Sequence, residues 1–267
     1  MSELERRFER LLIDKGVVAA GSGAVVPLHF DAQQSRLRIA AGFVDPAHFT
    51  YRNPERAAVV ARAFPWSHGY VSVAVSYATT RDAETQVAGY AYNRSYEDLR
   101  EVLAVAVAYL RESGLRAASL FDSNQAFDKG LARRAGIGLV GRHTMVMVPK
   151  AGSRVVLGSI FTERLLSVSV GRRFRSDPCR NCRRCVDACP TGAIRLPGTL
   201  VAEHCIASIL LKSCPLEGTS ASGVPPDAPT MAGVPHACAS RITIPNPSCS
   251  TPSQRSRAGK TNTSAAW

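Results

Sequence analysis

The sequence lacks a hydrophobic run long enough to cross a bilayer. Its best apolar run in a helical pattern, Val102 to Leu110, falls far short of the roughly 20 residues that a transmembrane helix needs. The N-terminal residues also lack the apolar centre of a signal peptide. Leu4, Phe8 and Leu11 instead share one face of a short amphipathic helix. We therefore expect a cytoplasmic protein.

Acidic residues are scarce. The 267 residues include 21 Asp and Glu against 33 Lys and Arg, which gives a net charge of +12. Such an excess favours a polyanionic partner, and nucleic acid is the first candidate. The alternative is that the charge serves only solubility.

Four of the eight cysteines lie in one short run, at Cys179, Cys182, Cys185 and Cys189. Cysteines in a reducing compartment serve more often as ligands or catalysts than as disulfides. The spacing C-x2-C-x2-C-x3-C-P is typical of bacterial ferredoxins, in which the fourth cysteine ligates a second cluster. Zinc is the alternative, because C-x2-C pairs also bind zinc. The pattern favours an iron–sulfur cluster.

The remaining cysteines do not supply a second such run. Cys205 follows on a helical segment, and Cys214, Cys238 and Cys249 stand alone. These last three lie in residues 213–267, which hold 8 of the 16 prolines and 9 serines. That composition buries too little to offset the entropy of ordering the chain. We expect most of this tail to be disordered or aberrant.

The first 175 residues alternate strand-like and helix-like segments, which predicts an α/β domain. The predicted strands are residues 71–77, 118–121, 144–148 and 155–161, and the predicted helices are residues 95–111 and 125–135. The stretch AGIGLVG (Ala135 to Gly141) matches G-x-G-x-x-G. A dinucleotide loop requires a strand before this motif and a helix after it. The order here is reversed, so we reject that interpretation, although glycines still let backbone approach a large ligand.

Several segments between Phe49 and Leu211 resemble the epoxyqueuosine reductases, which are cobalamin- and iron–sulfur-dependent enzymes of tRNA modification. The matching stretches, in order, are FTYRNPER, AYNRSYEDL, LFDSNQAFDKGLARRAGIGLVGRHT, VVLGSIFTE, CRNCRRCVDACPTGAI and EHCIASIL. The resemblance implies a cobalamin-binding catalytic α/β domain (residues 1–175) followed by a partial ferredoxin-like 4Fe-4S domain (residues 176–212). It also implies reduction of epoxyqueuosine to queuosine at the tRNA wobble position.

The resemblance assigns roles to individual residues. Asp122 corresponds to the proton donor, and the cobalamin contacts are Arg56, Tyr90, Arg94, Tyr96, Gly138, Gly141 and His143. The metal ligands are Cys179, Cys182, Cys185, Cys189 and Cys205. From the residues alone, Asp122 or Asn124 could equally cap the following helix, and the arginines could be surface charges. Tyr96 could be a core aromatic, and His143 a loop residue or a cobalt ligand.

The sequence departs from the family pattern at several positions. Ser95 and Glu97 stand where the family usually has Asp and His. Leu139 replaces a usual Trp, and Arg142 and His143 stand where Lys and Asn are usual. The family's second cysteine run is absent, so at most one of its two [4Fe-4S] clusters is well supported here. The match ends near Leu211, which suggests a truncated or frameshifted C-terminus.

The resemblance further implies a monomer that acts on tRNA, takes electrons from a donor such as ferredoxin or flavodoxin, and has no membrane contact. Two other hypotheses remain open at this point. One is a noncatalytic electron carrier or defective paralogue. The other is a different corrinoid-dependent reductase. Corrin binding separates the first alternative from the enzyme, and activity on epoxyqueuosine-tRNA separates the second.

Overall fold

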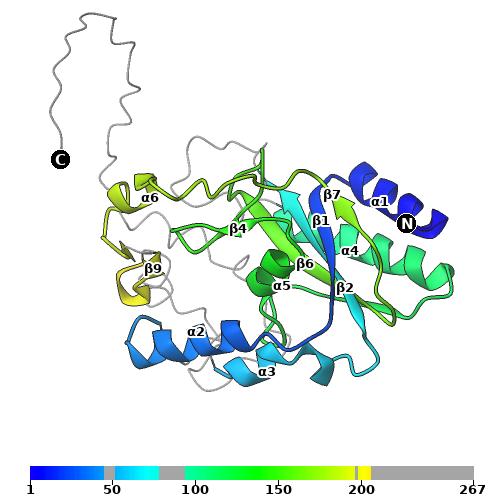
Figure 1. Cartoon of the computed structure of the whole chain (residues 1–267), viewed down its shortest axis with the longest axis horizontal. Helices are drawn as coiled ribbons and strands as arrows, with labels where there is room; N and C mark the ends of the chain where they lie inside the picture. The colour runs from blue at the N-terminus through cyan, green and yellow to red at the C-terminus, as the bar shows by residue number, and fades with distance from the viewer. Residues whose placement is uncertain (45–51, 78–93, 196–197, 206–267) are drawn as a thin grey trace, which may run out of the picture.

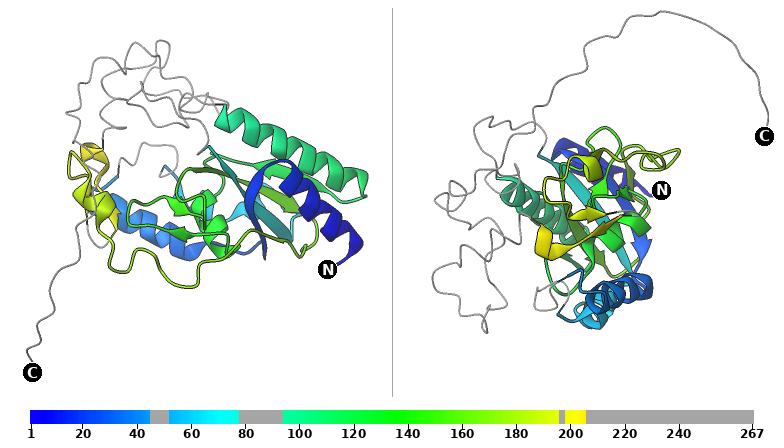
Figure 2. Two further views of the ribbon diagram at one scale, coloured as in Figure 1. Left: turned by 90° about the horizontal axis from the view of Figure 1, so that it is seen from above. Right: turned by 90° about the vertical axis from the view of Figure 1, so that its left-hand side faces the viewer.

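The computed structural model describes residues 1–44, 52–77, 94–195 and 198–205, and shows a sheet between two helical layers (Figures 1 and 2). Its helices are α1 (Glu3–Asp14), α2 (His29–Ala40), α3 (Pro54–Ala58), α4 (Ser95–Glu112), α5 (Asp128–Arg134) and α6 (Arg184–Asp187), with short 3-10 helices η1 (Val60–Arg62) and η3 (Ala202–His204). Its strands are β1 (Val17–Ala24), β2 (Gly69–Ser76), β3 (Ala117–Leu120), β4 (Leu139–Val140), β5 (Val146–Met147), β6 (Val155–Thr162), β7 (Ser169–Val170), β8 (Ile194–Arg195) and β9 (Thr199–Leu200).

The main sheet has the order β3-β6-β2-β1-β7. Every pairing between these strands is antiparallel. β2 and β6 lie at the centre and are buried along almost their whole length. Strands covered on both faces read as continuous β-branched runs, and this is why these two strands are the ones most visible in the sequence.

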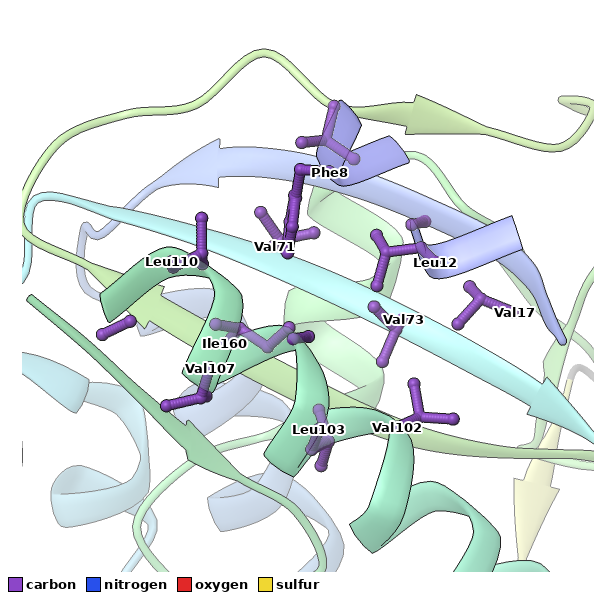
Figure 3. Close-up of a cluster of buried hydrophobic side chains, with 14 of the residues drawn as sticks. Phe8, Leu12, Val17, Val71, Val73, Val102, Leu103, Val107, Leu110 and Ile160 are labelled. Atoms are coloured by element: carbon purple, nitrogen blue, oxygen red, sulfur yellow. The ribbon is translucent and has the colours of Figure 1, made fainter. Parts of the chain in front are cut away.

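The face of the sheet under α1 and α4 forms one core cluster (Figure 3). Leu99, Leu103 and Leu110 of α4 are fully buried against Val71 and Ile160 of the sheet. Gly158 of β6 makes this approach possible, because a Cβ there would lie 2.8 Å from Leu103 Cδ1. The other face packs against α2, α3 and α5 through a second cluster.

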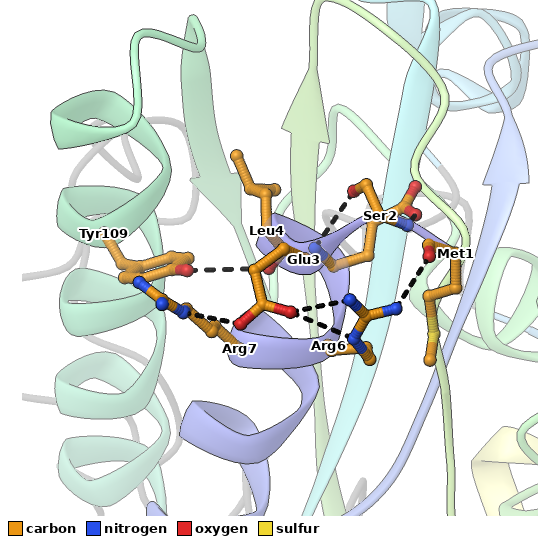
Figure 4. A network of polar contacts seen from close by, with 8 residues as sticks. Met1, Ser2, Glu3, Leu4, Arg6, Arg7 and Tyr109 are labelled. Atoms are coloured by element: carbon orange, nitrogen blue, oxygen red, sulfur yellow. Dashed lines mark hydrogen bonds and ion pairs between the residues drawn. The ribbon is translucent and has the colours of Figure 1, made fainter.

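Helix α1 is fixed at its start by a capping box (Figure 4). Glu5 Oε2 accepts the backbone N–H of Ser2 at 2.5 Å, and Glu5 Oε1 accepts the N–H of Ser167 at 2.8 Å. These hydrogen bonds lower the pKa of Glu5. Phe8 stacks on Tyr109 of α4 with ring centroids 5.9 Å apart. The helix therefore belongs to the core, as its amphipathic pattern predicts.

Most predicted elements are confirmed, with shifted bounds. The helix predicted at residues 95–111 is α4, and Gly114 follows it in the left-handed conformation. The helix predicted from Gln125 begins only at Asp128, and the strand predicted from Thr144 begins only at Val146. The predicted tail lies outside the described residues. Within the described part of the chain, no helix is long and apolar enough to cross a membrane.

Candidate functional site

Asp122 lies two residues beyond β3 in a strained turn. Its φ of 45° is in the left-handed region, which is unfavourable for most residues with a side chain but is tolerated best by Asn and Asp. The stabilising contact is a hydrogen bond of 3.0 Å from the Asp122 N–H to Asp128 Oδ2. Helix α5 has Phe127 as its N-cap and no side-chain cap. The capping role considered for Asp122 or Asn124 is therefore wrong.

Burial raises the pKa of Asp122 above its ordinary value. Burial also raises the pKa of Asp128 to about 7, against the opposing effect of the hydrogen bond from the Asp122 N–H. The neighbouring charge of Asp122 raises it further. Asp128 Oδ1 is buried away from solvent and has no hydrogen-bond partner among the described residues. A carboxyl pair of this kind holds a proton near neutral pH.

Tyr96 and Arg56 lie on segments that meet the Asp122 turn. Tyr96 of α4 stacks on Phe121 with ring centroids 6.3 Å apart, so it is next to the turn as well as partly in the core. Arg56 lies in α3, and its backbone N–H donates to Oδ1 of the N-cap residue Asn53 at 2.9 Å. Arg56 and Gln125 line one cavity of about 270 Å³. The structure therefore brings three of the predicted site segments together.

Arg94 is placed differently. It sits at the N-terminal end of α4, and its Nε lies 3.0 Å from Glu97 Oε2 with both side chains exposed. This ion pair matches the surface-charge interpretation. Tyr90 lies outside the described residues.

Gly138 precedes the β4–β5 hairpin (residues 139–147), and Gly141 lies within it. Packing inside the hairpin accounts for a glycine at both positions. A Cβ on Gly138 would lie 2.3 Å from Met147 O, and one on Gly141 would lie 2.8 Å from His143 Cε1. Their small size is needed by the hairpin itself. A ligand contact at either glycine stays a prediction.

His143 turns its ring back onto its own hairpin. Its Nδ1 accepts the Met145 N–H at 3.1 Å. Burial lowers the pKa of His143, which favours the neutral ring near pH 7. With Nδ1 bound to the backbone, Nε2 is the ring nitrogen through which any ligation of a metal would occur.

The cysteine module, residues 176–205, consists of tight turns around α6. The Cys182 N–H donates to Cys179 O at 3.2 Å, and the Cys189 N–H donates to Val186 O at 3.3 Å. All five described cysteines are free thiols of intermediate exposure. No three Cys, His, Asp or Glu side chains in the described ranges converge as they would on a single metal ion. A cubane makes a different demand, because each of its thiolates binds a separate iron.

The thiol of Cys189 has a lowered pKa. Partial burial alone would raise its pKa, but hydrogen bonds from the backbone of Ile194, Thr191 and Ala193 and from the Thr191 hydroxyl outweigh burial and lower it. A lowered pKa favours the thiolate, which is the form that binds metal. The donor set of soft, accessible thiols therefore fits an iron–sulfur cluster.

The module contacts the α/β domain at two places that no sequence pattern indicates. Arg142 of the β4–β5 hairpin donates to Cys179 O at 2.9 Å and to Arg180 O at 3.0 Å. The Ala202 N–H donates to Phe43 O, beyond the end of α2, at 2.7 Å. Figures 1 and 2 show the module at the end of the molecule far from α1.

Comparisons with known proteins identify the cysteine module and relatives of the chain. Residues 173–195 match the family model described as a 4Fe-4S binding domain. Epoxyqueuosine reductase of Bacillus subtilis is 29% identical over 190 residues, which cover 67% of this chain and 48% of that protein. The enzyme of Pseudomonas aeruginosa is 33% identical over 139 residues, or 49% of this chain and 37% of that protein. The chain spans about half the length of the curated relatives it matches.

Solved structures give the same result for the fold. A crystal structure of epoxyqueuosine reductase with an epoxyqueuosine-modified tRNA stem loop superposes with a TM-score of 0.66 at 25% identity, over 78% of this chain and 57% of that one. The B. subtilis enzyme with an aspartate-bearing catalytic loop swung out of its active site gives a TM-score of 0.63 at 25% identity, over 78% of this chain and 58% of that one.

Proposed function

We propose that the chain is a member of the epoxyqueuosine reductase family and that it reduces epoxyqueuosine to queuosine in tRNA with the help of a cobalamin and an iron–sulfur cluster. The observation that carries this proposal is the Asp122 turn. It places a half-buried carboxyl with a raised pKa next to Phe121, on which Tyr96 stacks, and three residues before Gln125, which shares a cavity with Arg56. The site is one in which a proton can be held until an oxygen leaves.

The chemistry needs electrons and a proton donor. When bound, a cobalamin would supply electron transfer at the carbon–oxygen bond, and the cysteine module would hold the cluster that feeds it. Opening an epoxide develops negative charge on oxygen. A carboxylic acid placed there donates a proton to that oxygen, a contribution of about 10²–10⁴-fold. The left-handed Asp122 backbone fixes where this acid is held.

The residues divide the work between two parts. We assign the corrin-binding catalytic part to residues 1–175 and the cluster-binding part to residues 176–212. We assign Arg56 and Tyr96 to cobalamin binding, because Arg56 shares a cavity with Gln125 and Tyr96 stacks on Phe121 next to the acid. Cys179, Cys182, Cys185 and Cys189 hold iron. The +12 net charge supports a tRNA substrate, and such a substrate implies a cytoplasmic enzyme. A monomer with an external donor such as ferredoxin or flavodoxin completes the proposal.

The test is Asp122→Asn. The amide keeps the shape of the acid but has no acidic proton, so single-turnover reduction of epoxyqueuosine-tRNA should fall by about 10²–10⁴-fold while cobalamin stays bound. Nucleoside analysis of the tRNA measures the product, and corrin absorbance after gel filtration measures binding. Asp14→Asn, on the exposed end of α1, is the control. Unchanged turnover in Asp122→Asn would leave Asp122 with a structural role only.

A further inference from the structure

Arg142 ties the cysteine module to the α/β domain at the first cluster ligand. Its guanidinium donates from Nε to Cys179 O and from Nη2 to Arg180 O, across 37 and 38 residues of sequence. These two nitrogens lie in one rigid plane, so the fork matches two successive carbonyls. Both bonds are charge-assisted, which makes them stronger than neutral hydrogen bonds.

The carbonyl that Arg142 binds belongs to the turn that presents the first cysteines. Cys179 O also accepts the Cys182 N–H at 3.2 Å, which closes the first C-x2-C gap. On the other side of the same residue, the Cys179 N–H donates to Asp177 Oδ1 at 2.8 Å. Both peptide groups of Cys179 are therefore fixed, and Arg142 is the contact that fixes them to the other domain.

Arg142 is itself held by the hairpin that carries it. The Gly141 N–H donates to Met145 O at 2.9 Å, and the Thr144 N–H donates to Gly141 O at 2.8 Å. The hairpin then joins α5, which begins at Asp128 beside the Asp122 turn. Gly198 of the cysteine module packs on the backbone of Arg142, where a Cβ would lie 3.4 Å from Arg142 Cα. Arg142 thus contacts the module at its first cysteine and at its β8–β9 turn.

We propose that Arg142 is the positioning residue that seats the Cys179 turn, and with it the iron–sulfur cluster, against the β4–β5 hairpin. Within the described residues its bonds go to carbonyls rather than to a carboxylate. Its positive charge is therefore available to a thiolate-ligated cluster, which becomes more negative on reduction. The proposal builds on the cluster of the proposed function, but it depends on neither corrin nor tRNA.

Three variants separate the fork from the charge. Arg142→Gln removes both, and Arg142→Lys keeps the charge but loses the planar fork. Arg180→Gln is the matched control, because it removes one exposed positive charge beside Cys179 and leaves the Arg142 hydrogen bonds in place. Each full-length protein is reconstituted anaerobically with iron and sulfide. Loss of the cluster's visible absorbance is then followed in excess iron chelator.

Arg142→Gln should lose its cluster about tenfold faster than the wild type, since two charge-assisted bonds are removed. Arg142→Lys should lie between the two, and Arg180→Gln should match the wild type. The reduction potential of the cluster should fall in Arg142→Gln, measured by EPR-monitored titration without corrin. In the cluster-free proteins, trypsin should cut the segment 172–184 faster in Arg142→Gln than in the wild type.

The proposal would be overturned if both Arg142 variants lost the cluster no faster than the wild type. So would equal losses in Arg142→Gln and Arg180→Gln, which would mean that charge alone matters. If Arg142→Gln does not fold by circular dichroism, the comparison of Arg142→Lys with Arg180→Gln decides. Normal dependence on Arg142 together with no activity on tRNA would contradict the proposed function and leave the positioning role intact.

Discussion

The α/β domain and the cysteine module are stabilised in different ways. The domain has two clusters of buried side chains on the two faces of one sheet. In the described part of the module, only Ala193 and Val201 are buried. A segment that buries so little gains its order from metal ligands and from a few contacts with a neighbour. We therefore expect the domain to fold without a bound cofactor, and the module to depend on iron and on its contacts with the domain.

Cys179→Ala should give the largest difference between the two regions, because it affects the cluster and not the stability of the domain. Removing this thiolate should abolish stable cluster assembly, because the first cluster then retains only two ligands in its turn. The free energy of unfolding of the α/β domain should stay within about 0.5 kcal/mol of the wild-type value, since no core packing changes. Iron analysis and thermal unfolding by circular dichroism measure the two effects. A domain that melts together with cluster loss would contradict the division.

Leu103→Ala should have the opposite effect, lowering the stability of the domain without affecting the cluster. Leu103 is 1% exposed in the core under α4, so its truncation should lower the free energy of unfolding by about 2–5 kcal/mol. At a temperature where the variant is still folded, its cluster should persist in chelator as long as in the wild type. Denaturant titration gives the first value and visible absorbance the second. Leu37→Ala, at an exposed position of α2, is the control for truncation alone.

A pH effect on the free energy of unfolding should arise from Asp128 in the domain. Burial raises the pKa of Asp128 to about 7, so the folded state binds this proton more tightly than the unfolded chain does. The stability from the protonated form is fully present below the ordinary pKa and is lost as the pH rises toward 7. Asp128→Asn should therefore gain about 2–4 kcal/mol relative to the wild type between pH 4 and pH 8. Denaturant titrations across this range measure it, and an equal difference at both pH values would count against a buried acid.

Positive charge immediately before the module should affect RNA binding more than charge on α1, at the far end of the domain. Arg172, Arg173 and Arg175 are exposed just before the cysteine run. Reversing their charge should flatten the dependence of log K on log salt by about 0.7–0.9 for each phosphate that is no longer neutralised. Reversal of Arg7 and Arg10 on α1 should leave the slope unchanged. Filter binding of tRNA over a salt series gives both slopes, and equal slopes would exclude residues 172–175 from the RNA interface.

The iron content sharpens the picture of the module itself. Cys179, Cys182 and Cys185 can seat one cluster, whereas Cys189 and Cys205 supply only two ligands to a second. Reconstituted protein should hold about four irons in a stable form rather than the roughly eight of two cubanes. Mössbauer spectroscopy distinguishes the cases, and two stable [4Fe-4S] signals would show that the isolated cysteines of the tail are ligands.

The elements that the sequence predicts well are those whose local pattern agrees with their burial. Helix α4 has apolar periodicity and a terminal glycine, and β2 and β6 are β-branched runs between covered faces. Strand β1 is not predicted, because VVAAGSGA is rich in residues of low strand propensity. Its pairing with β2 and β7 imposes the extended conformation.

The site is predictable in its residue types but not in its geometry. The cysteine spacing and the position of Asp122 after a strand are local features that the sequence displays. The left-handed φ of Asp122 depends on a hydrogen bond to a residue six positions on. The role of Arg142 depends on carbonyls 37 and 38 residues away. Interactions of this kind follow from tertiary packing, and no local pattern encodes them.

The most direct test of the proposed enzyme is a single turnover on tRNA. The full-length protein is loaded anaerobically with iron, sulfide and cobalamin, reduced chemically, and mixed with epoxyqueuosine-modified tRNA. Nucleoside analysis should show queuosine with the wild type and a loss of about 10²–10⁴-fold with Asp122→Asn. Wild-type protein that holds both its cluster and its cobalamin, yet leaves epoxyqueuosine unchanged, would contradict the proposal.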